Sequence, residues 1–235
     1  MWIPFDEKFI IKAFVQIVPY LRVTFLVLFG TVLFGLFVGS LLAKARLGKR
    51  KALNRLADIY IKSIRCTPGI VMLFIIYYGT PKVFDVFGIN LNDFPKAFFV
   101  ILALGLLFSA SAAEILRSAF LTISQGQYEA AVTIGLTDFQ AYRRIVFPQL
   151  VAVALPNFGN SFIAILKEGS LAYSIGLIDI MGKGNLIIAK RYGGNSLETY
   201  IALAILYWIV VFIFEKVFLF AEKKFSKGKK EFAHV

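Results

Sequence analysis

The sequence predicts an all-α integral membrane protein with five transmembrane helices, forming a single domain over residues 1–235. Of the 235 residues, 59% are apolar, 16% aromatic and only 17% charged. A soluble domain of this length does not need so large an apolar share. Several apolar runs also reach the length of about 20 residues that an α-helix needs to cross the hydrocarbon core. Both observations place the chain in a lipid bilayer.

The charge balance and the rare residues exclude several other classes. The formal net charge of +12 would suit nucleic acid, but the basic residues cluster beside apolar runs, where they meet anionic lipid. We therefore expect membrane lipid, and no nucleic acid, as a partner. The single cysteine, Cys66, excludes an internal disulfide and a cysteine-based metal site, and the single histidine, His234, lies in the tail. Because the sequence contains no phosphate-binding loop or catalytic motif, we expect no metal site, no cofactor of its own and no enzymatic activity.

The first two predicted elements are a short surface helix and a membrane span. Over residues 5–20, apolar and polar positions alternate at helical spacing, which is typical of a helix lying in the interface plane. The following segment is uncharged between Arg22 and Lys44 and is long enough to cross the bilayer once. We place this first span at about 21–43.

The second predicted span, at about 59–80, has an open inner boundary. It overlaps the end of residues 44–65, the densest positive segment, which we place in the cytoplasm. The span begins near Ile59 or at Pro68. Thr67-Pro68 either starts or kinks a helix, because proline lacks an N–H and disfavours helical geometry in the residue before it.

Three further spans follow along the chain. The third is predicted at about 97–117 and the fourth at about 149–167, the latter interrupted by Pro156. Residues 167–198 are polar and rich in glycine. Part of this stretch can re-enter the membrane, but only where protein or a water-filled cavity covers its backbone. The fifth span is predicted at about 199–221 and is followed by a basic tail.

The distribution of lysine and arginine predicts the orientation. Five spans put the two chain ends on opposite sides of the membrane. The segments 44–65, 117–144 and 216–230 fall on one side and hold eight, three and six basic residues, more in total than the alternating segments. Because basic loops stay in the cytoplasm, we expect the N-terminus outside and the C-terminus inside.

Residues 124–148 are predicted to form two short helices joined by a sharp turn. Two capping boxes of the Ser/Thr-x-x-Gln type begin these helices: Ser124 with Gln127, and Thr137 with Gln140. Gly135 ends the first helix, since glycine adopts the left-handed turn most easily. Pro148 stops the second helix. The topology places this segment in the cytoplasm.

Two interpretations of this segment stay open. Glu129 lies near the start of the first helix, where a carboxylate interacts favourably with the helix dipole. The small side chains of Ala130 and Ala131 allow another surface to approach one side of that helix closely. A segment ordered in this way is suited to docking on a partner. The alternative is a simple structured connector between two spans, because capping signals occur in any helix pair.

Charged and polar side chains near the apolar runs are candidates for a transport pathway. Lys167 and Glu168, at the end of the interrupted fourth span, offer the opposite charges that a zwitterion needs, or they form a simple ion pair at the interface. Glu114 is a second candidate, although Arg117 three residues on provides a partner on the same helix face. The full predicted set is Glu114, Asn160, Lys167, Glu168 and Ser170.

One motif in the predicted cytoplasmic segment resembles the EAA signature of ABC-importer permease subunits. Its residues are Glu129-Ala130-Ala131, Gly135, Ile145 and Pro148, with Phe147 where that family usually has leucine. Four further runs look like those of polar amino acid permeases: Arg65-Cys66-Thr67-Pro68, Ala113-Glu114-Ile115-Leu116-Arg117, Ser124-Gln125-Gly126-Gln127 and Leu166-Lys167-Glu168-Gly169-Ser170-Leu171. Cys66 stands where the family has glycine, and Glu168-Gly169 where it has aspartate with serine or threonine. The resemblance covers roughly residues 20 to 222.

The resemblance implies a fold and a mechanism. The fold is that of a type I ABC importer permease, and residues 124–148 act as a coupling helix in a groove of a cytoplasmic ATPase subunit. The implied docking residues are Gln127, Glu129, Ala130, Ala131, Gly135 and Leu136. Two ATPase subunits, not this chain, bind ATP and Mg²⁺, and transport proceeds by alternating access. The other implied partners are a second permease subunit, identical or related, and an extracytoplasmic amino-acid-binding protein, in the cell membrane of a prokaryote.

The resemblance also orders the candidate substrates. Residues 174–184 are similar to a run in permeases for cystine and related sulfur amino acids, so we place that class first. Glutamine or glutamate comes next, and then arginine, histidine or lysine.

Two other classes of function compete with the importer. A stand-alone channel or ion-coupled carrier is expected to show more ionisable groups within its spans or an internal repeat, and neither is evident; the other class is a membrane scaffold without transport.

Overall fold

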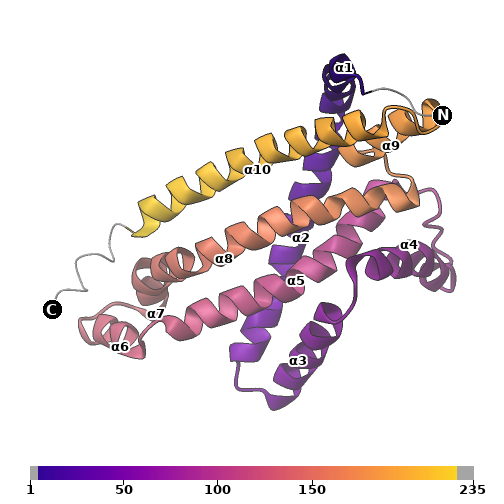
Figure 1. Ribbon diagram of the computed structural model, residues 1–235. Helices are drawn as coiled ribbons and strands as arrows, with labels where there is room; N and C mark the ends of the chain where they lie inside the picture. Colours follow the sequence, from indigo (N-terminus) through magenta and orange to yellow (C-terminus); the bar gives the residue numbers. More distant parts are fainter. Residues whose placement is uncertain (1–4, 227–235) are drawn as a thin grey trace.

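The computed structural model describes residues 5–226, and within that range every regular element is helical (Figure 1). The α-helices are α1 (Glu7–Ile17), α2 (Leu21–Leu47), α3 (Lys51–Arg65), α4 (Gly69–Asp85), α5 (Lys96–Thr122), α6 (Gln125–Thr133), α7 (Asp138–Ala141), α8 (Phe147–Glu168), α9 (Ile180–Lys190) and α10 (Ser196–Ser226). Short helical turns join some of them: η1 (Val18–Tyr20), η2 (Tyr142–Val146) and η3 (Gly169–Ile175). Between residues 5 and 226, four helical runs are long and apolar enough to cross a membrane, or five if α3 and α4 together form one bent span. The predicted all-α membrane class is confirmed.

Helices α2 and α5 pack closely because small residues line both sides of their contact. A Cβ atom added to Gly35 would lie 2.7 Å from the carbonyl oxygen of Gly105, and one added to Gly39 would lie 2.8 Å from that of Ser109. Small residues allow membrane helices to approach in this way. The resulting seam fixes α2 against α5 at the centre of the molecule (Figure 1).

Phenylalanine side chains fill the space between α8, α10 and this central pair. The ring centroid of Phe162 lies 4.8 Å from that of Phe214 and 5.3 Å from that of Phe218. Phe108 of α5 is buried in the same cluster. Both measured pairs are edge-on, which is a favoured arrangement for aromatic rings. Part of the large phenylalanine content therefore serves contacts between helices.

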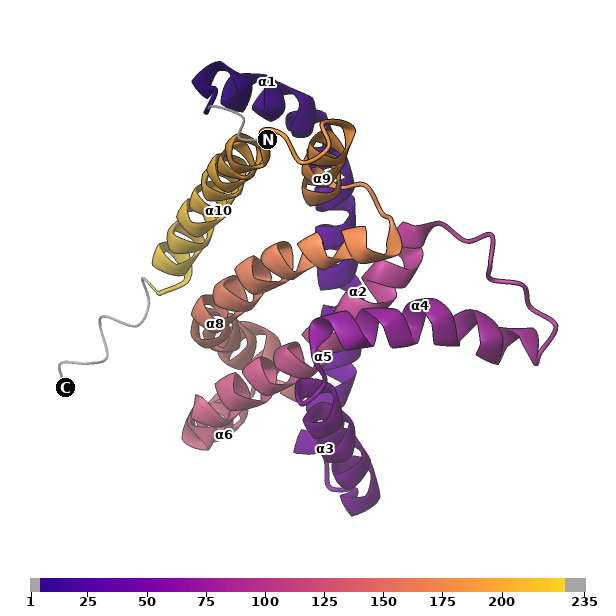
Figure 2. The same cartoon turned by 45° about the vertical axis from the view of Figure 1, so that its right-hand side comes forward.

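Helix α1 packs on α9 and α10 along one stripe. Phe9, Ala13 and Ile17 recur every four residues and are buried against those two helices. At the start of α1, the backbone N–H of Asp6 donates to the Glu198 carboxylate at 2.8 Å. Figure 2 shows α1 crossing over the ends of α9 and α10. Part of the apolar surface expected to face the membrane interface is therefore used for packing within the protein.

The second predicted span is not one straight helix. Helices α3 and α4 meet at 108° across residues 66–68, so the break predicted at Thr67-Pro68 is confirmed and the first part of 59–80 belongs to α3 (Figure 2). The cause is the proline: Pro68 has no N–H to donate to the preceding turn, and it becomes the N-cap of α4. Of the two predicted starting points, Pro68 is the one at which α4 begins. The helix then continues past residue 80 to Asp85.

The chain between α5 and α8 contains the two predicted short helices, α6 and α7. The predicted stop at Pro148 is wrong, because α7 continues through η2 into α8. The turn η2 is a π-helix, in which the N–H of Phe147 donates to the carbonyl oxygen of Tyr142. Pro148 then falls in the first turn of α8, where a missing N–H is tolerated.

The basic segments gather at one end of the molecule. In Figure 1, α6 and α7 lie at the lower left, on the same side as the C-terminal ends of α2 and α10, whereas α1, α9 and the start of α10 lie at the upper right. This arrangement agrees with a common side for the segments rich in lysine and arginine. The assignment of that side to the cytoplasm stays a prediction.

Candidate coupling segment and transport cavity

Residues 124–148, which we call the coupling segment, turn sharply at Gly135. This residue has a φ angle of +92°, in the left-handed region that favours glycine. The N–H of Leu136 donates to the carbonyl of Ala131 at 3.1 Å, and the N–H of Gly135 donates to that of Val132 at 2.9 Å. These two bonds form a Schellman motif, which satisfies the last carbonyls of α6. The predicted helix end at Gly135 is confirmed.

Only one of the two predicted capping boxes forms. The Gln140 N–H donates to the Thr137 hydroxyl at 3.3 Å and the Thr137 N–H donates to the Gln140 side chain at 3.1 Å, so this box begins α7. Ser124 is the N-cap of α6, but its side chain makes no capping bond, which corrects the first box. The Gln127 side chain instead accepts a hydrogen bond from Gln149 of α8. A contact distant in sequence has replaced the local one.

Two tyrosines hold α6 against the helices that follow it. The hydroxyl of Tyr128 donates to the Asp138 carboxylate at 2.8 Å, and its ring centroid lies 5.1 Å from that of Tyr142. The bond to Asp138 raises the pKa of Tyr128 above its ordinary value, because deprotonation would bring two negative charges together. Sequence reasoning missed this contact. It makes α6, α7 and η2 one ordered unit.

The surface of the coupling segment exposes large apolar side chains together with most of the predicted docking residues. Ile134 is 80% exposed and Phe139 is 71% exposed. Of the predicted docking residues, the structure exposes Gln127, Glu129, Ala130 and Gly135, half-buries Leu136 and buries Ala131. Ala131 therefore packs inside the segment, while most of the set is open to a partner.

A hollow of about 350 Å³ opens beside the coupling segment. Its walls come from the end of α5, the start of α6 and η2, and include Phe120, Tyr142 and Val146. Glu129, the acidic residue of the motif, also lines this hollow. An apolar recess with a carboxylate at its wall is thus part of the same exposed surface.

A second cavity, of about 240 Å³, lies where α3, α4, α5 and α8 meet; we call it the central cavity. Arg65 and Thr67 line it from the α3–α4 break, and Ser111 lines it from α5. Ser161 and Glu168 line it from α8, seven residues apart and therefore on one helix face. Neither charged side chain makes an ion pair among residues 5–226. One space is thus bordered by opposite charges and three hydroxyl groups.

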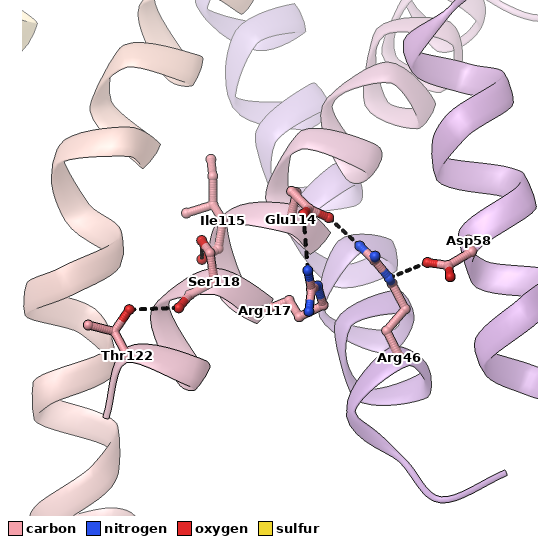
Figure 3. A network of polar contacts seen from close by, with 7 residues as sticks. All are labelled: Arg46, Asp58, Glu114, Ile115, Arg117, Ser118 and Thr122. Atoms are coloured by element: carbon pink, nitrogen blue, oxygen red, sulfur yellow. Dashed lines mark hydrogen bonds and ion pairs between the residues drawn. The ribbon is translucent and has the colours of Figure 1, made fainter. Parts of the chain in front are cut away.

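Glu114, a predicted pathway residue, is held in a cluster of charges between three helices (Figure 3). Arg46, at the end of α2, pairs with Glu114 of α5 and, through Nε, with Oδ1 of Asp58 of α3 at 2.5 Å. Arg117 reaches Glu114 from the next turn of α5 at 3.5 Å. This pairing confirms the alternative given by the three-residue spacing, namely that Arg117 is an ion-pair partner of Glu114. Arg46 was not foreseen, because it lies 68 residues from Glu114 in the sequence.

Comparison with known proteins covers nearly the whole chain. Residues 32–227 match a family model described as the inner membrane component of binding-protein-dependent transport systems. The L-cystine transport system permease protein TcyL of Bacillus subtilis is 40% identical over 96% of this chain and 93% of that protein. The probable amino-acid permease protein YxeN of the same organism is 36% identical over 94% of this chain and 96% of that protein.

The chain belongs to this family of transport-system inner membrane components. A crystal structure of an amino acid ABC transporter with histidines agrees in fold: one of its chains matches at a TM-score of 0.74 and 31% identity, over 94% of this chain and 100% of that one. The fold is that of a type I ABC importer permease. The permease is a non-catalytic subunit, and ATP hydrolysis is performed by a separate ATPase.

The permease brings only part of the predicted pathway set together. Glu168 lines the central cavity, whereas Asn160 and Lys167 are exposed and do not line it. The Ser170 hydroxyl donates to the carbonyl oxygen of Lys167 at 2.7 Å. The two serines of the cavity, Ser111 and Ser161, were not predicted from the sequence, although the spacing of Ser161 from Glu168 could have indicated it. Ser161 shares the helix face of Glu168, and its neighbour Asn160 is turned away by one helical step.

Proposed function

We propose that this permease imports a polar amino acid by ATP-driven alternating access. The coupling segment carries the proposal, because it is held rigidly by its turn and cap and yet exposes Ile134 and Phe139. Two cytoplasmic ATPase subunits bind ATP and Mg²⁺ and close on each other. Their closure draws the coupling segments of two permease subunits together and opens the pathway outward; hydrolysis then returns it to the inward-facing state.

The docking surface consists of the exposed part of the coupling segment. Gln127, Glu129, Ala130, Gly135 and Leu136 meet the ATPase, and Ala131 supports them from within. An apolar side chain of the ATPase fits the hollow beside α6, whose walls include aromatic and aliphatic side chains. Glu129 lines the same hollow, where a cation or an N–H group of the partner can pair with it.

The central cavity is the proposed place for the amino acid. A zwitterion carries a carboxylate and an ammonium group, and the cavity offers Arg65 for the first and Glu168 for the second. Neither charge is neutralised by an ion pair among residues 5–226. The hydroxyls of Ser111 and Ser161 add hydrogen bonds that fix the orientation. Within the originally predicted pathway set, Glu168 is thus the residue that we place at the substrate.

Cystine or a related sulfur amino acid is the proposed substrate. The support is the 40% identity to the L-cystine permease over nearly the full length of both chains, together with the similarity of residues 174–184. Glutamine or glutamate is the second choice, and a basic amino acid is the third. A neutral zwitterion agrees with the cavity, where the single Arg and the single Glu balance each other.

The proposed setting is the cell membrane of a prokaryote. The permease lies there with its N-terminus outside and its basic C-terminal tail inside. A second permease subunit, identical or related, completes the pathway. An extracytoplasmic binding protein delivers the amino acid to the outer face.

Uptake by the reconstituted complex tests this function. Proteoliposomes containing the permease, its ATPase and its binding protein are supplied with labelled cystine, glutamine or arginine, with and without ATP inside. We expect cystine uptake that requires ATP and exceeds uptake of the other two. Equal uptake without ATP would instead support a channel or an ion-coupled carrier, and absence of all uptake by the assembled complex would support a scaffold.

A further inference from the structure

Arg46 occupies an unusual position among the basic residues of the permease. It lies in the last turn of α2, where most neighbouring basic side chains extend into solvent, yet only 16% of its side chain is exposed. Its guanidinium group contacts the carboxylates of Asp58 on α3 and Glu114 on α5. A planar guanidinium can hold two carboxylates at once, which a lysine ammonium does less well. One side chain thus joins three helices.

The cluster is balanced in charge and partly shielded from water. Glu114 accepts a second contact from Arg117 at 3.5 Å, so two arginines face two carboxylates. The side chains of Glu114 and Arg117 are both about one-third exposed. Removing one member leaves its partners incompletely paired, which is costly in a partly buried setting. The cluster therefore favours one arrangement of α2, α3 and α5 over others.

The cluster lies between the central cavity and the coupling segment along α5. Ser111, which lines the cavity, is one turn before Glu114. In the other direction the hydroxyls of Ser118 and Thr122 donate to backbone carbonyls of the preceding turn at 3.0 and 2.9 Å (Figure 3). Helix α5 then ends, and only Ile123 and Ser124 separate it from α6. The end of α5 is thus joined to α6 by a link of only two residues.

We propose that Arg46, Asp58, Glu114 and Arg117 are positioning residues that make the inner ends of α2, α3 and α5 move as one body. The cluster transmits the displacement of the coupling segment to the α3–α4 break, whose Arg65 and Thr67 line the central cavity. Glu114 then serves energy coupling rather than contact with the amino acid. This inference rests on the proposed function, because it requires an ATPase that moves the coupling segment.

The test uses the complete reconstituted complex and two conservative variants. Arg46→Lys retains the charge but loses the fork that holds two carboxylates, and Asp58→Asn removes one charge at a side chain that is 39% exposed. Arg50→Lys is the matched control, because Arg50 belongs to the same basic segment and makes no ion pair within the described residues. Co-purification of the ATPase, ATP hydrolysis and amino acid uptake are measured for each complex.

We expect Arg46→Lys and Asp58→Asn complexes to assemble and hydrolyse ATP but to transport at least about fivefold less amino acid per ATP than the wild type or the control. Adding Glu114→Gln to Arg46→Lys should cause little further loss, because residues that act as one unit are not additive. An unchanged ratio in the assembled variants would overturn the inference. Loss of assembly in both variants would also overturn it, by showing that the cluster only stabilises the fold. A wild-type complex without ATP-driven uptake would contradict the proposed function itself.

Discussion

Gly135 carries the strictest conformational requirement in the coupling segment. Its φ angle of +92° is unfavourable for any residue with a Cβ atom, although an added Cβ would meet no atom within 4 Å. The cost of a substitution therefore comes from the backbone and amounts to about 1–2 kcal/mol. Gly135→Ala is expected to loosen the turn between α6 and α7, lower the amount of ATPase that co-purifies with the permease and reduce uptake.

Gly126→Ala is the matched control for this turn. Gly126 lies in the first turn of α6, its φ angle is not positive, and an added Cβ would lie 3.6 Å from the Ser124 hydroxyl. Alanine favours helices over glycine, so this variant should keep or increase ATPase binding. Equal ATPase binding by Gly135→Ala and the wild type would contradict the role assigned to the turn.

Asp179 is a buried carboxyl group whose ionisation depends on the fold. Its carboxylate caps α9 by accepting the Gly182 N–H at 2.9 Å, and its burial raises the pKa from 3.8 to about 6. Because the folded protein holds the proton more tightly than the unfolded chain, Asp179 contributes stability that is complete below pH 4 and is lost as pH rises through 6. The difference corresponds to about 3 kcal/mol.

Asp179→Asn should therefore flatten the pH dependence of stability. Asparagine also caps helices, so the bond to Gly182 can be retained while the titration is removed. We expect the Tm of the wild type in detergent to fall between pH 5 and pH 7 by several degrees more than that of the variant. Asp85→Asn, at the exposed end of α4, is the control and should follow the wild type. A variant as pH-dependent as the wild type would refute this assignment.

At the scale of helices, the seam between α2 and α5 makes the clearest stability prediction. Gly39→Ala places a Cβ atom 2.8 Å from the Ser109 carbonyl and from the Ala112 side chain, so the helices must move apart. We expect a loss of about 1–3 kcal/mol and a lower Tm. Gly79→Ala in α4 meets nothing within 4 Å and should be neutral or stabilising. Equal melting temperatures for the two variants would be inconsistent with a close seam.

The face that α8 turns to the central cavity can be tested with two adjacent residues. Ser161 lines the cavity and Asn160 does not. Ser161→Ala should raise the KM of ATP-driven uptake several-fold through loss of a hydrogen bond to the substrate, whereas Asn160→Ala should leave KM near the wild-type value. The reverse order, measured as initial uptake rates at varied substrate concentration, would place the pathway on another face of α8.

The elements also show where local sequence signals succeed. The helix end at Gly135 and the cap at Thr137 were predictable, because both depend on a few neighbouring residues. The first capping box was not, since Gln149 of α8 competes for the Gln127 side chain. The stop expected at Pro148 failed because the π-turn before it lets the helix continue.

For the molecule as a whole, the apolar runs were sufficient to predict the all-α membrane class. What they could not give is the set of contacts between distant segments. The Arg46–Glu114 pair is separated by 68 residues, and the Arg65–Glu168 cavity depends on the 108° angle between α3 and α4. The ion pair and the cavity could not be predicted from the sequence, because both depend on how the helices are arranged in three dimensions.

In the proposed function, the coupling segment receives the motion of a cytoplasmic ATPase. Site-directed cross-linking tests it most directly, with Ile134→Cys in a Cys66→Ser background, because Ile134 is highly exposed at the turn of that segment. We expect a cross-link from residue 134 to the ATPase subunit, with a yield that changes on ATP binding. Labelling of residue 134 by an impermeant thiol reagent from outside intact cells, with no cross-link to the ATPase, would contradict it.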